Sequence, residues 1–381
     1  MLEDAVPWFG GSVESQRLDF CRLAESGSEV TFSELCLRFG VSRKTGYKWL
    51  ARYLDGGPGA LENLSRAPHS SPTRTSREVE EKVLEVRDEH PAWGGRKIRR
   101  RLIDLGNVEV PAPATITGIL HRHDKIPPAE PHAGGFVSFE ADEPNDMWQM
   151  DFKGWFTCGM GRCDPFDVLD DHSRYNLCLE ALTDQRTTTV KASLTDTFTT
   201  YGTPKWMLMD NGQPWGTSQA GFRWTTLTVW LLDLGISVTH SRPRHPQTLG
   251  KDERFHRTLK LEVISTRQVW DSHQQIQTAF DAWRHVYNHE RPHDSLDLDV
   301  PASRYQPSQR PMPARIEPVD YPDGYDVRKV GAQARIRFRG ARYKIGKPFA
   351  GRHVGIIPTT TDGVFNVVYR HQHIKTIDLT Q

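Results

Sequence analysis

The stretch MWQMDFKGWF, residues 147–156, decides the fold of the middle of the chain. Apolar and polar residues alternate along it, which is the pattern of a β-strand. Asp151 stands inside this predicted strand, between Met150 and Phe152. An acid without a partner is costly to bury in such surroundings, so Asp151 is a candidate functional residue.

The residues after this stretch predict alternating strands and helices. FDVLDDHSRYNLCLEAL, residues 166–182, predicts two short strands around a turn, with Asp170 and Asp171 as turn formers. Because strands precede and separate helices, residues 140–305 are expected to form one α/β domain. The other elements expected within it are a helix over 187–201, a buried strand ending at Asp210, and helices over 250–264 and 273–290.

A helix, a tight turn and a basic helix follow one another near the start of the chain. FSELCLRFG, residues 32–40, predicts a short amphipathic helix, and Ser42 can cap the helix expected over residues 43–54. This order is typical of a helix-turn-helix domain, expected over residues 1–58, whose second helix enters the major groove. A helical hairpin without a DNA role is the alternative. DNA is favoured by the basic residues Arg43, Lys44, Lys48 and Arg52.

A second helical module is expected over residues 74–126. REVEEKVLEVRDEH, residues 77–90, predicts a helix that stops before Pro91. A basic stretch, WGGRKIRRRL, and a third helix within residues 110–124 follow it, and we interpret the whole as a second helix-turn-helix domain. Its candidate DNA-binding residues are Arg96, Lys97 and Arg100.

The last part of the chain is basic and rich in strand-like runs. ARIRFRG, ARYKIG, HVGIIPT and FNVVYR are separated by glycine and proline turns. They predict a small β-barrel, or an open antiparallel sheet, over residues 325–381. From Val327 to Gln381 eleven Lys or Arg stand against two acids. Such a surface usually meets a polyanion, although a solvated basic face is the simpler alternative.

Composition narrows the class of protein. A chain of 381 residues suggests several domains, and its net charge of +1 conceals the local basic regions. The five cysteines form an odd, scattered set that fits a reducing cytosol, and Cys158 and Cys163 lack partners for a zinc site. No run of about twenty apolar residues exists, and residues 1–11 lack the pattern of a secretory leader. We expect a cytoplasmic, nucleoid-associated protein.

Three acids stand where their elements would direct them into a cleft: Asp151, Asp210 and Glu253. Glu253 shares one face of its predicted helix with cations that can take phosphates, whereas Asp252, about 100° away, should point elsewhere. Three carboxylates close together repel one another unless divalent cations balance them. Oxygen donors without His or Cys favour Mg²⁺ or Mn²⁺, and two such ions suit phosphoryl transfer.

These motifs resemble those of a known family. WQMDF, DNG and HPQTLGKDERFHRTLK (residues 245–260) are similar to the three acidic motifs of DDE transposases with a retroviral-integrase core. DDHSRY, WRHVYNHERPHDSL and the two helix-turn-helix modules also resemble family patterns, so the resemblance covers nearly the whole chain. It implies a bacterial insertion-sequence transposase with an RNase H-like core. By motif match it assigns Asp151, Asp210 and Glu253 as the metal-binding catalytic triad and Lys260 as a position that contacts the DNA end, and Arg254 and His256 match motif positions as well. Arg254, Arg257 and Lys260 are the candidate DNA-binding residues of this helix, Arg257 because it shares the face of Glu253.

The resemblance also implies an activity. Such a protein binds terminal inverted repeats as a homo-oligomer and, with two Mg²⁺ or Mn²⁺ ions, cleaves the transposon end and joins its 3′-OH to target DNA. The alternatives are a DNA-binding regulator with an inactive core and another RNase H-like nuclease.

One departure from the family concerns the third acid. The 42 residues between Asp210 and Glu253 exceed the usual separation, which predicts an added loop within residues 213–231. The longer spacing leaves Asp252 open as an alternative third acid.

Overall fold

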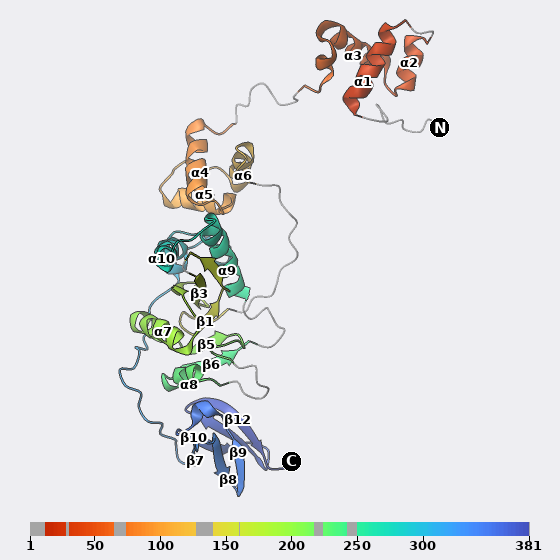
Figure 1. Cartoon of the computed structure of the whole chain (residues 1–381). Helices are drawn as coiled ribbons and strands as arrows, with labels where there is room; N and C mark the ends of the chain where they lie inside the picture. The colour runs from red at the N-terminus through yellow and green to blue at the C-terminus, as the bar shows by residue number, and fades with distance from the viewer. Residues whose placement is uncertain are drawn as a thin grey trace. The chain divides into compact units, whose positions relative to one another are not determined.

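The computed structural model describes residues 12–27, 30–64, 74–126, 140–159, 161–216, 224–241 and 250–380 (Figure 1). The chain divides into two compact units, Met1–Arg74 and Thr75–Gln381. Two predictions lie outside the described residues: the nature of the first eleven residues and the start of the third acidic motif before Gly250.

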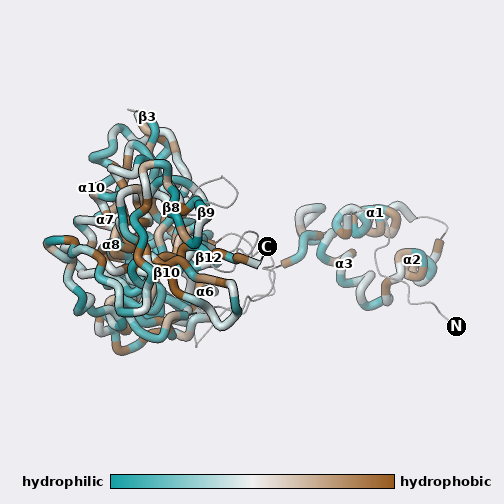
Figure 2. Tube along the Cα trace, turned by 90° about the horizontal axis from the view of Figure 1, so that it is seen from below, coloured by the Kyte–Doolittle hydropathy of each residue, from teal (hydrophilic) through white to brown (hydrophobic). Residues whose placement is uncertain are grey.

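The first unit is a small helical domain. It contains α1 (Val13–Glu25), α2 (Phe32–Arg38) and α3 (Arg43–Gly56), which confirms the two helices predicted for the helix-turn-helix. Brown and teal stretches mix along these helices in Figure 2, as expected for amphipathic helices around a core. Each helix begins at a hydroxyl cap: Ser12, Thr31 and Ser42.

The second unit begins with another three-helix module. Its helices are α4 (Arg77–Glu89), α5 (Gly95–Asp104) and α6 (Pro113–Arg122), as predicted. Gly95 allows α5 and α6 to approach closely, because a Cβ there would lie 2.4 Å from the carbonyl oxygen of Pro113. The core of the module consists of Val83, Val86, Trp93, Ile98, Leu102, Ile116, Ile119 and Leu120.

A mixed sheet forms the centre of the second unit. Its strand order is β2-β3-β1-β5-β6, with β4 also paired to β3. β1, β5 and β6 are parallel neighbours, whereas β3 runs antiparallel to β1 and to β4. The bounds are β1 (Met147–Phe152), β2 (Phe156–Cys158), β3 (Gly161–Asp170), β4 (Asn176–Leu182), β5 (Trp206–Met209) and β6 (Ser237–His240).

Helices cover both faces of this sheet. Trp148 and Met150 of β1 pack in one core with α7 (Thr187–Tyr201) and α8 (Thr226–Asp233). On the other face, Leu169 and Leu179 pack with α9 (Gly250–Glu262) and α10 (His273–His289). Because side chains alternate along a strand, Asp151 and Asp167 point to the α9 face.

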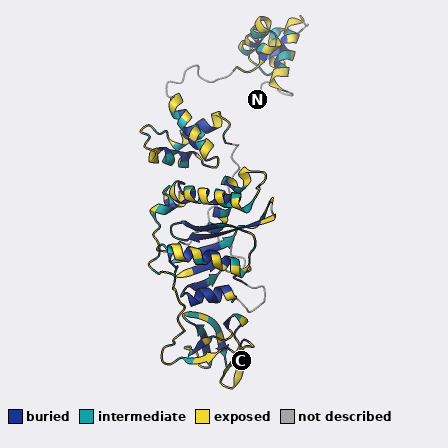
Figure 3. Ribbon diagram, turned by 60° about the vertical axis from the view of Figure 1, so that its left-hand side comes forward, coloured by how far each residue is buried: buried dark blue, intermediate teal, exposed yellow. Residues whose placement is uncertain are grey.

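The region predicted to be an added loop is in part a helix. Within residues 213–231 the chain forms the start of α8, whose residues from Leu227 to Asp233 are all buried, as the dark blue helix in Figure 3 shows. The prediction was therefore wrong for residues 226–231. The run TLTVWLLD has almost no polar face, so no helical periodicity was visible in the sequence.

The C-terminal strands form two open sheets. The larger has the order β12-β11-β10-β7, and β8 and β9 form a separate hairpin whose turn places Arg339 and Gly340 at positive φ. The closed barrel expected from the sequence is not confirmed, because no ring of hydrogen bonds joins the strands that the structure describes. The bounds are β7 (Asp326–Lys329), β8 (Arg335–Phe338), β9 (Ala341–Lys344), β10 (His353–Pro358), β11 (Val364–Tyr369) and β12 (Gln372–Asp378).

The C-terminal sheet packs on the central core, and ion pairs and a hydrogen bond connect the two. Asp233 at the end of α8 accepts a hydrogen bond from the Tyr369 hydroxyl at 2.5 Å and pairs with Arg352 and Arg370. Across the described residues, no helix combines the length and the apolar character that a membrane crossing requires.

Candidate active site

Two of the predicted acids lie at the same edge of the sheet. β1 and β5 are adjacent parallel strands in which Gln149 pairs with Leu208. Asp151 is two residues beyond Gln149, and Asp210 is two residues beyond Leu208, so the same register makes the two acids level with each other. Acids at the carboxyl ends of neighbouring parallel strands commonly face a functional cleft.

The Asp151 carboxyl is in an environment that disfavours its charged form. Burial raises its pKa to about 7, and the charges of Asp167 and Asp210 add to the shift while His256 opposes it. The effect of Asp210 agrees with the level positions of the two acids on adjacent strands. A cation placed beside Asp151 would favour its charged form.

The Asp210 carboxylate is held by hydrogen bonds that the sequence did not predict. Its Oδ1 accepts from the backbone N–H of Gly212 at 2.8 Å and from the indole N–H of Trp215 at 2.5 Å. Trp215 is buried and its ring stacks on Phe152 of β1, with centroids 5.3 Å apart. Trp215 is therefore a positioning residue for Asp210. In the sequence, Trp215 differs from its neighbours only as an aromatic residue in a polar stretch that is rich in turn residues.

Asp252 and Glu253, which are neighbours on α9, lie in different environments. Asp252 is completely buried and shares the inner face of the helix with Phe255 and Leu259. Glu253 is exposed, and no hydrogen bond or ion pair is seen for it among the described residues. Helical spacing from Glu253 predicted that Asp252 would point away from the site, and this was wrong. The apolar anchors of the helix, three and seven residues after Asp252, direct it inward instead.

A further buried acid, Asp167, connects the sheet to α9. Asp167 of β3 is the cross-strand partner of Asp151, and its Oδ1 lies 2.5 Å from Nε2 of His256. Burial alone would lower the pKa of His256, but the charge and the hydrogen bond of Asp167, together with the charge of Asp151, outweigh it and the pKa is raised. Asp167 was not among the predicted site residues, although it too is an acid inside an apolar strand.

The two acids at the end of β3, Asp170 and Asp171, have structural roles. Oδ1 of Asp170 accepts from the backbone N–H of Ser173 at 2.8 Å, as predicted for a turn former. Asp171 pairs with Lys251 at 2.6 Å. Within the described ranges, no three His, Cys, Asp or Glu side chains are grouped closely enough to hold a metal ion as they stand.

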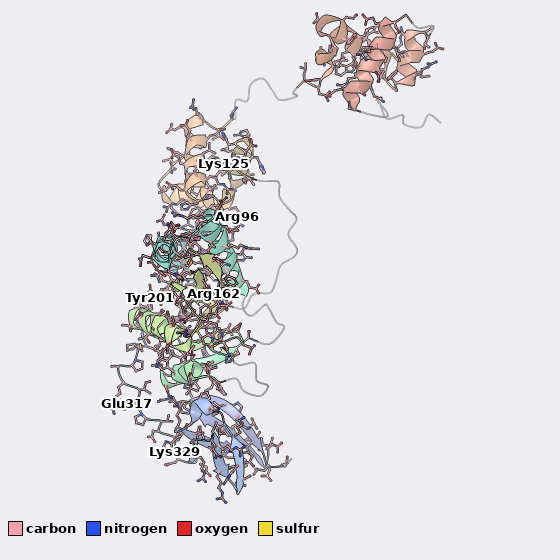
Figure 4. The ribbon with its side chains drawn as sticks, viewed as in Figure 1. Arg96, Lys125, Arg162, Tyr201, Glu317 and Lys329 are labelled. Carbon is pink, nitrogen blue, oxygen red and sulfur yellow. The ribbon has the colours of Figure 1, made fainter. Side chains whose placement is uncertain are left out.

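The predicted DNA-binding residues fall into two classes. On α3 and α9 they are mostly exposed, with Arg52 half-buried over the ring of Trp49. On α5 they form ion pairs with the central domain, where Arg96 is labelled in Figure 4. The pairs are Arg96–Asp294 at 3.0 Å, Lys97–Asp294 at 3.9 Å and Arg100–Asp299 at 2.9 Å, and Arg101 beside them contacts Glu290.

Comparison with known domains matches most of the chain. Residues 16–69 match a helix-turn-helix domain and residues 45–120 a homeodomain-like domain. Residues 141–246 and 234–301 match two models of the integrase core domain. Residues 325–381 match the C-terminal domain of IS481 family transposases.

Solved structures with similarity to this chain are retroviral integrases. An intasome chain of simian T-cell lymphotropic virus, solved with PP2A regulatory subunit B56 gamma, has 16% identity and a TM-score of 0.37, over 78% of this chain and 98% of that one. The HTLV-2 integrase catalytic core in complex with magnesium has 10% identity and a TM-score of 0.34, over 44% and 100%. The BIV integrase core has 18% identity and a TM-score of 0.32, over 42% and 92%.

Helix-turn-helix domains, an integrase core domain and the C-terminal domain of IS481 transposases thus follow one another in this chain, which is the organisation of an insertion-sequence transposase of the DDE class.

Proposed function

We propose that this protein binds the terminal inverted repeats of an insertion sequence and catalyses metal-dependent DNA cleavage and strand transfer. The observation that carries the proposal is the level position of Asp151 and Asp210 on adjacent parallel strands of an integrase core domain. Two carboxylates at one sheet edge supply oxygen ligands of the kind that Mg²⁺ and Mn²⁺ prefer.

Glu253 is proposed as the third acid of the site, on the strength of its motif. It lies in the first turn of α9, directly after residues 242–249, which the structure does not describe. Because it is exposed and without a partner among the described residues, its carboxylate is free to turn toward a bound ion. Two divalent cations held by these acids would activate the attacking oxygen and stabilise the leaving one.

The residues around the acids position them and the DNA. Trp215 and Gly212 fix one oxygen of Asp210, so that its second oxygen is left for a ligand. Arg254, Arg257 and Lys260 are exposed on the same helix as Glu253 and can contact phosphates next to the scissile bond. Catalysis then rests on positioning and charge stabilisation without a covalent enzyme intermediate.

DNA recognition is assigned first to α3. Arg43, Lys44 and Lys48 are exposed on this helix, as a recognition helix in the major groove requires. On α5, Arg96, Lys97 and Arg100 remain candidates, but phosphates would have to displace the carboxylates that now hold them. Because two DNA ends must be handled together, we propose a homo-oligomer as the active form.

The test is incubation of the purified chain with Mg²⁺ and a labelled duplex made from the inverted repeats that flank its reading frame. Cleavage at the end and joined products support the proposal. Binding without cleavage contradicts it and indicates a regulator with an inactive core. Cleavage of DNA junctions or hybrids without end specificity contradicts it as well, and indicates a different RNase H-like nuclease.

A further inference from the structure

We infer that Asp252, together with Asp167 and Asp151, binds a divalent cation, so that the cation site of this core extends beyond the motif triad. The inference rests on the proposed function, since it concerns the same metal-dependent site. It adds two carboxylates that the motif match leaves without a role.

The first observation is the state of Asp252. Its side chain is 0% exposed, and neither carboxylate oxygen has a hydrogen-bond partner among the residues that the structure describes. A buried carboxylate of this kind is normally paired or coordinates a metal, because transfer of a charge from water to a protein interior is unfavourable. Its neighbours Phe255 and Leu259 on the inner face of α9 supply no donor.

The second observation is what lies opposite Asp252. Asp167 is also 0% exposed. In the described part of the chain its Oδ2 has no hydrogen-bond partner, whereas its Oδ1 lies against His256. His256 follows Asp252 by four residues, so both side chains lie on one face of α9. The contact between His256 and Asp167 therefore brings Asp252 beside Asp167, and Asp151 is the cross-strand neighbour of Asp167.

The third observation is the balance of charge. The nearby cations are already engaged, Lys251 with Asp171 and His256 with Asp167. Lys153 acts on Asp167 as well. Asp151 and Asp252 are left without an ion-pair partner among the described residues, so a divalent cation between them would balance two carboxylates with one ion.

The competing account is that Asp252 simply holds a proton in an apolar site. Both accounts explain the burial of Asp252, but they predict different effects of an Asp252 substitution on metal binding. A protonated, structural Asp252 can be replaced by Asn without loss of metal binding. A ligand cannot, because Asn brings neither the charge nor the second anionic oxygen. The side chains would turn slightly to close on the ion, since they do not form a ready-made ligand group.

The experiment measures Mn²⁺ binding to the full chain without DNA, by titration calorimetry and by the Mn²⁺-induced rise in melting temperature. Asp252→Asn is compared with the wild type, and Asp252→Val provides a second variant that removes the charge if the first does not fold. Asp281→Asn, an exposed acid on α10, is the matched control. We expect both Asp252 variants to weaken Mn²⁺ binding at least tenfold and the control to leave it unchanged.

Two outcomes overturn the inference. If Asp252→Asn binds Mn²⁺ as the wild type does while Asp210→Asn does not, Asp252 is structural and the proposed function stands. If the wild type binds no Mn²⁺ at millimolar concentrations, the cation site and the proposed metal-dependent function both fail. The DNA cleavage assay, run separately with the wild type, reports on the proposed function alone.

Discussion

Nε2 of His256 on α9 lies 2.5 Å from Oδ1 of Asp167 on β3, and both side chains are nearly excluded from solvent. This contact is the polar link between the helix that carries the third acidic motif and the strand beside Asp151. Together with the packing of Phe255 and Leu259, it holds α9 beside the candidate active site.

Removal of this link should destabilise the second unit. We expect His256→Ala to lower the free energy of unfolding by about 2–3 kcal/mol, because it leaves Asp167 buried without its partner. Arg257→Ala, at the next position on the exposed side of the helix, is the control and should change stability by less than about 0.5 kcal/mol. If His256→Ala and Arg257→Ala lower the free energy of urea unfolding equally, the contact between His256 and Asp167 does not stabilise the second unit.

The indole N–H of Trp215 should contribute to catalysis, because it orients the carboxylate of Asp210. Trp215→Phe keeps most of the buried ring surface but removes the donor that holds Oδ1 of Asp210. We expect single-turnover DNA cleavage to fall about tenfold or more, as is usual when a group that orients a metal-binding carboxylate is lost. Trp224→Phe, whose N–H contacts the carbonyl of Ile374, is the control and should cleave normally.

The central domain was largely predictable because its strands and helices carry periodic patterns. The strand with Asp151, the turn at Asp170 and the strand before Asp210 all follow from alternation and turn residues. The fully apolar helix α8 could not be recognised in this way, since it has no polar face to set a period.

The candidate site could be predicted from the sequence only in part. Strand position and motif match predicted Asp151 and Asp210 as candidates, and the sheet register brings these two acids level. The sequence could not show that Asp252 turns inward, because that depends on how Phe255 and Leu259 anchor α9. Asp167 meets His256 across 89 residues of sequence, and tertiary contacts of this kind have no local signature.

The ion pairs between α5 and the central domain should differ in their contributions to stability. The contact of Arg101 with Glu290 leaves the two side chains 21% and 27% exposed, whereas Arg96 and Asp294 are 62% and 43% exposed. We expect Arg101→Ala to cost about 1–2 kcal/mol and Arg96→Ala less than about 0.5 kcal/mol, because solvent screens the more exposed pair. A larger loss for Arg96→Ala in chemical denaturation would contradict this order.

Lys97 should make the stability of the second unit depend on pH. Burial lowers its pKa to about 8, and the charge of Arg291 adds to the shift while Asp294 and Glu262 oppose it. Between pH 8 and the ordinary value near 10.5, the unfolded chain binds more protons at this residue than the folded chain. The contribution of Lys97 to the free energy of unfolding therefore rises with pH across this window.

The corresponding variant is Lys97→Met. It should be more stable than the wild type by about 1–2 kcal/mol at pH 7, and the difference should shrink toward pH 10. Lys82→Met, on the exposed side of α4, is the control and should show no such change. If the stability difference between Lys97→Met and the wild type stays constant from pH 7 to pH 10, the lowered pKa of Lys97 is not its cause.

The close packing of α3 in the first unit should make Gly46 sensitive to substitution. A Cβ at this position would lie 2.7 Å from the Cys36 sulfur and 2.9 Å from Phe20. We expect Gly46→Ala to destabilise the first unit by about 1–3 kcal/mol and to weaken DNA binding with it. Gly59→Ala meets open space and is the control. Hydrogen exchange of the amides in residues 30–64 reports on this unit separately from the rest of the chain.

The most direct test is strand joining by the full chain in Mg²⁺, with a labelled transposon-end duplex that already carries a free 3′-OH and with plasmid as target. The account predicts joined product for the wild type, and for Asp210→Asn no product but unchanged affinity for the duplex. Joining by Asp210→Asn at the rate of the wild type would contradict the assignment of this aspartate to the active site.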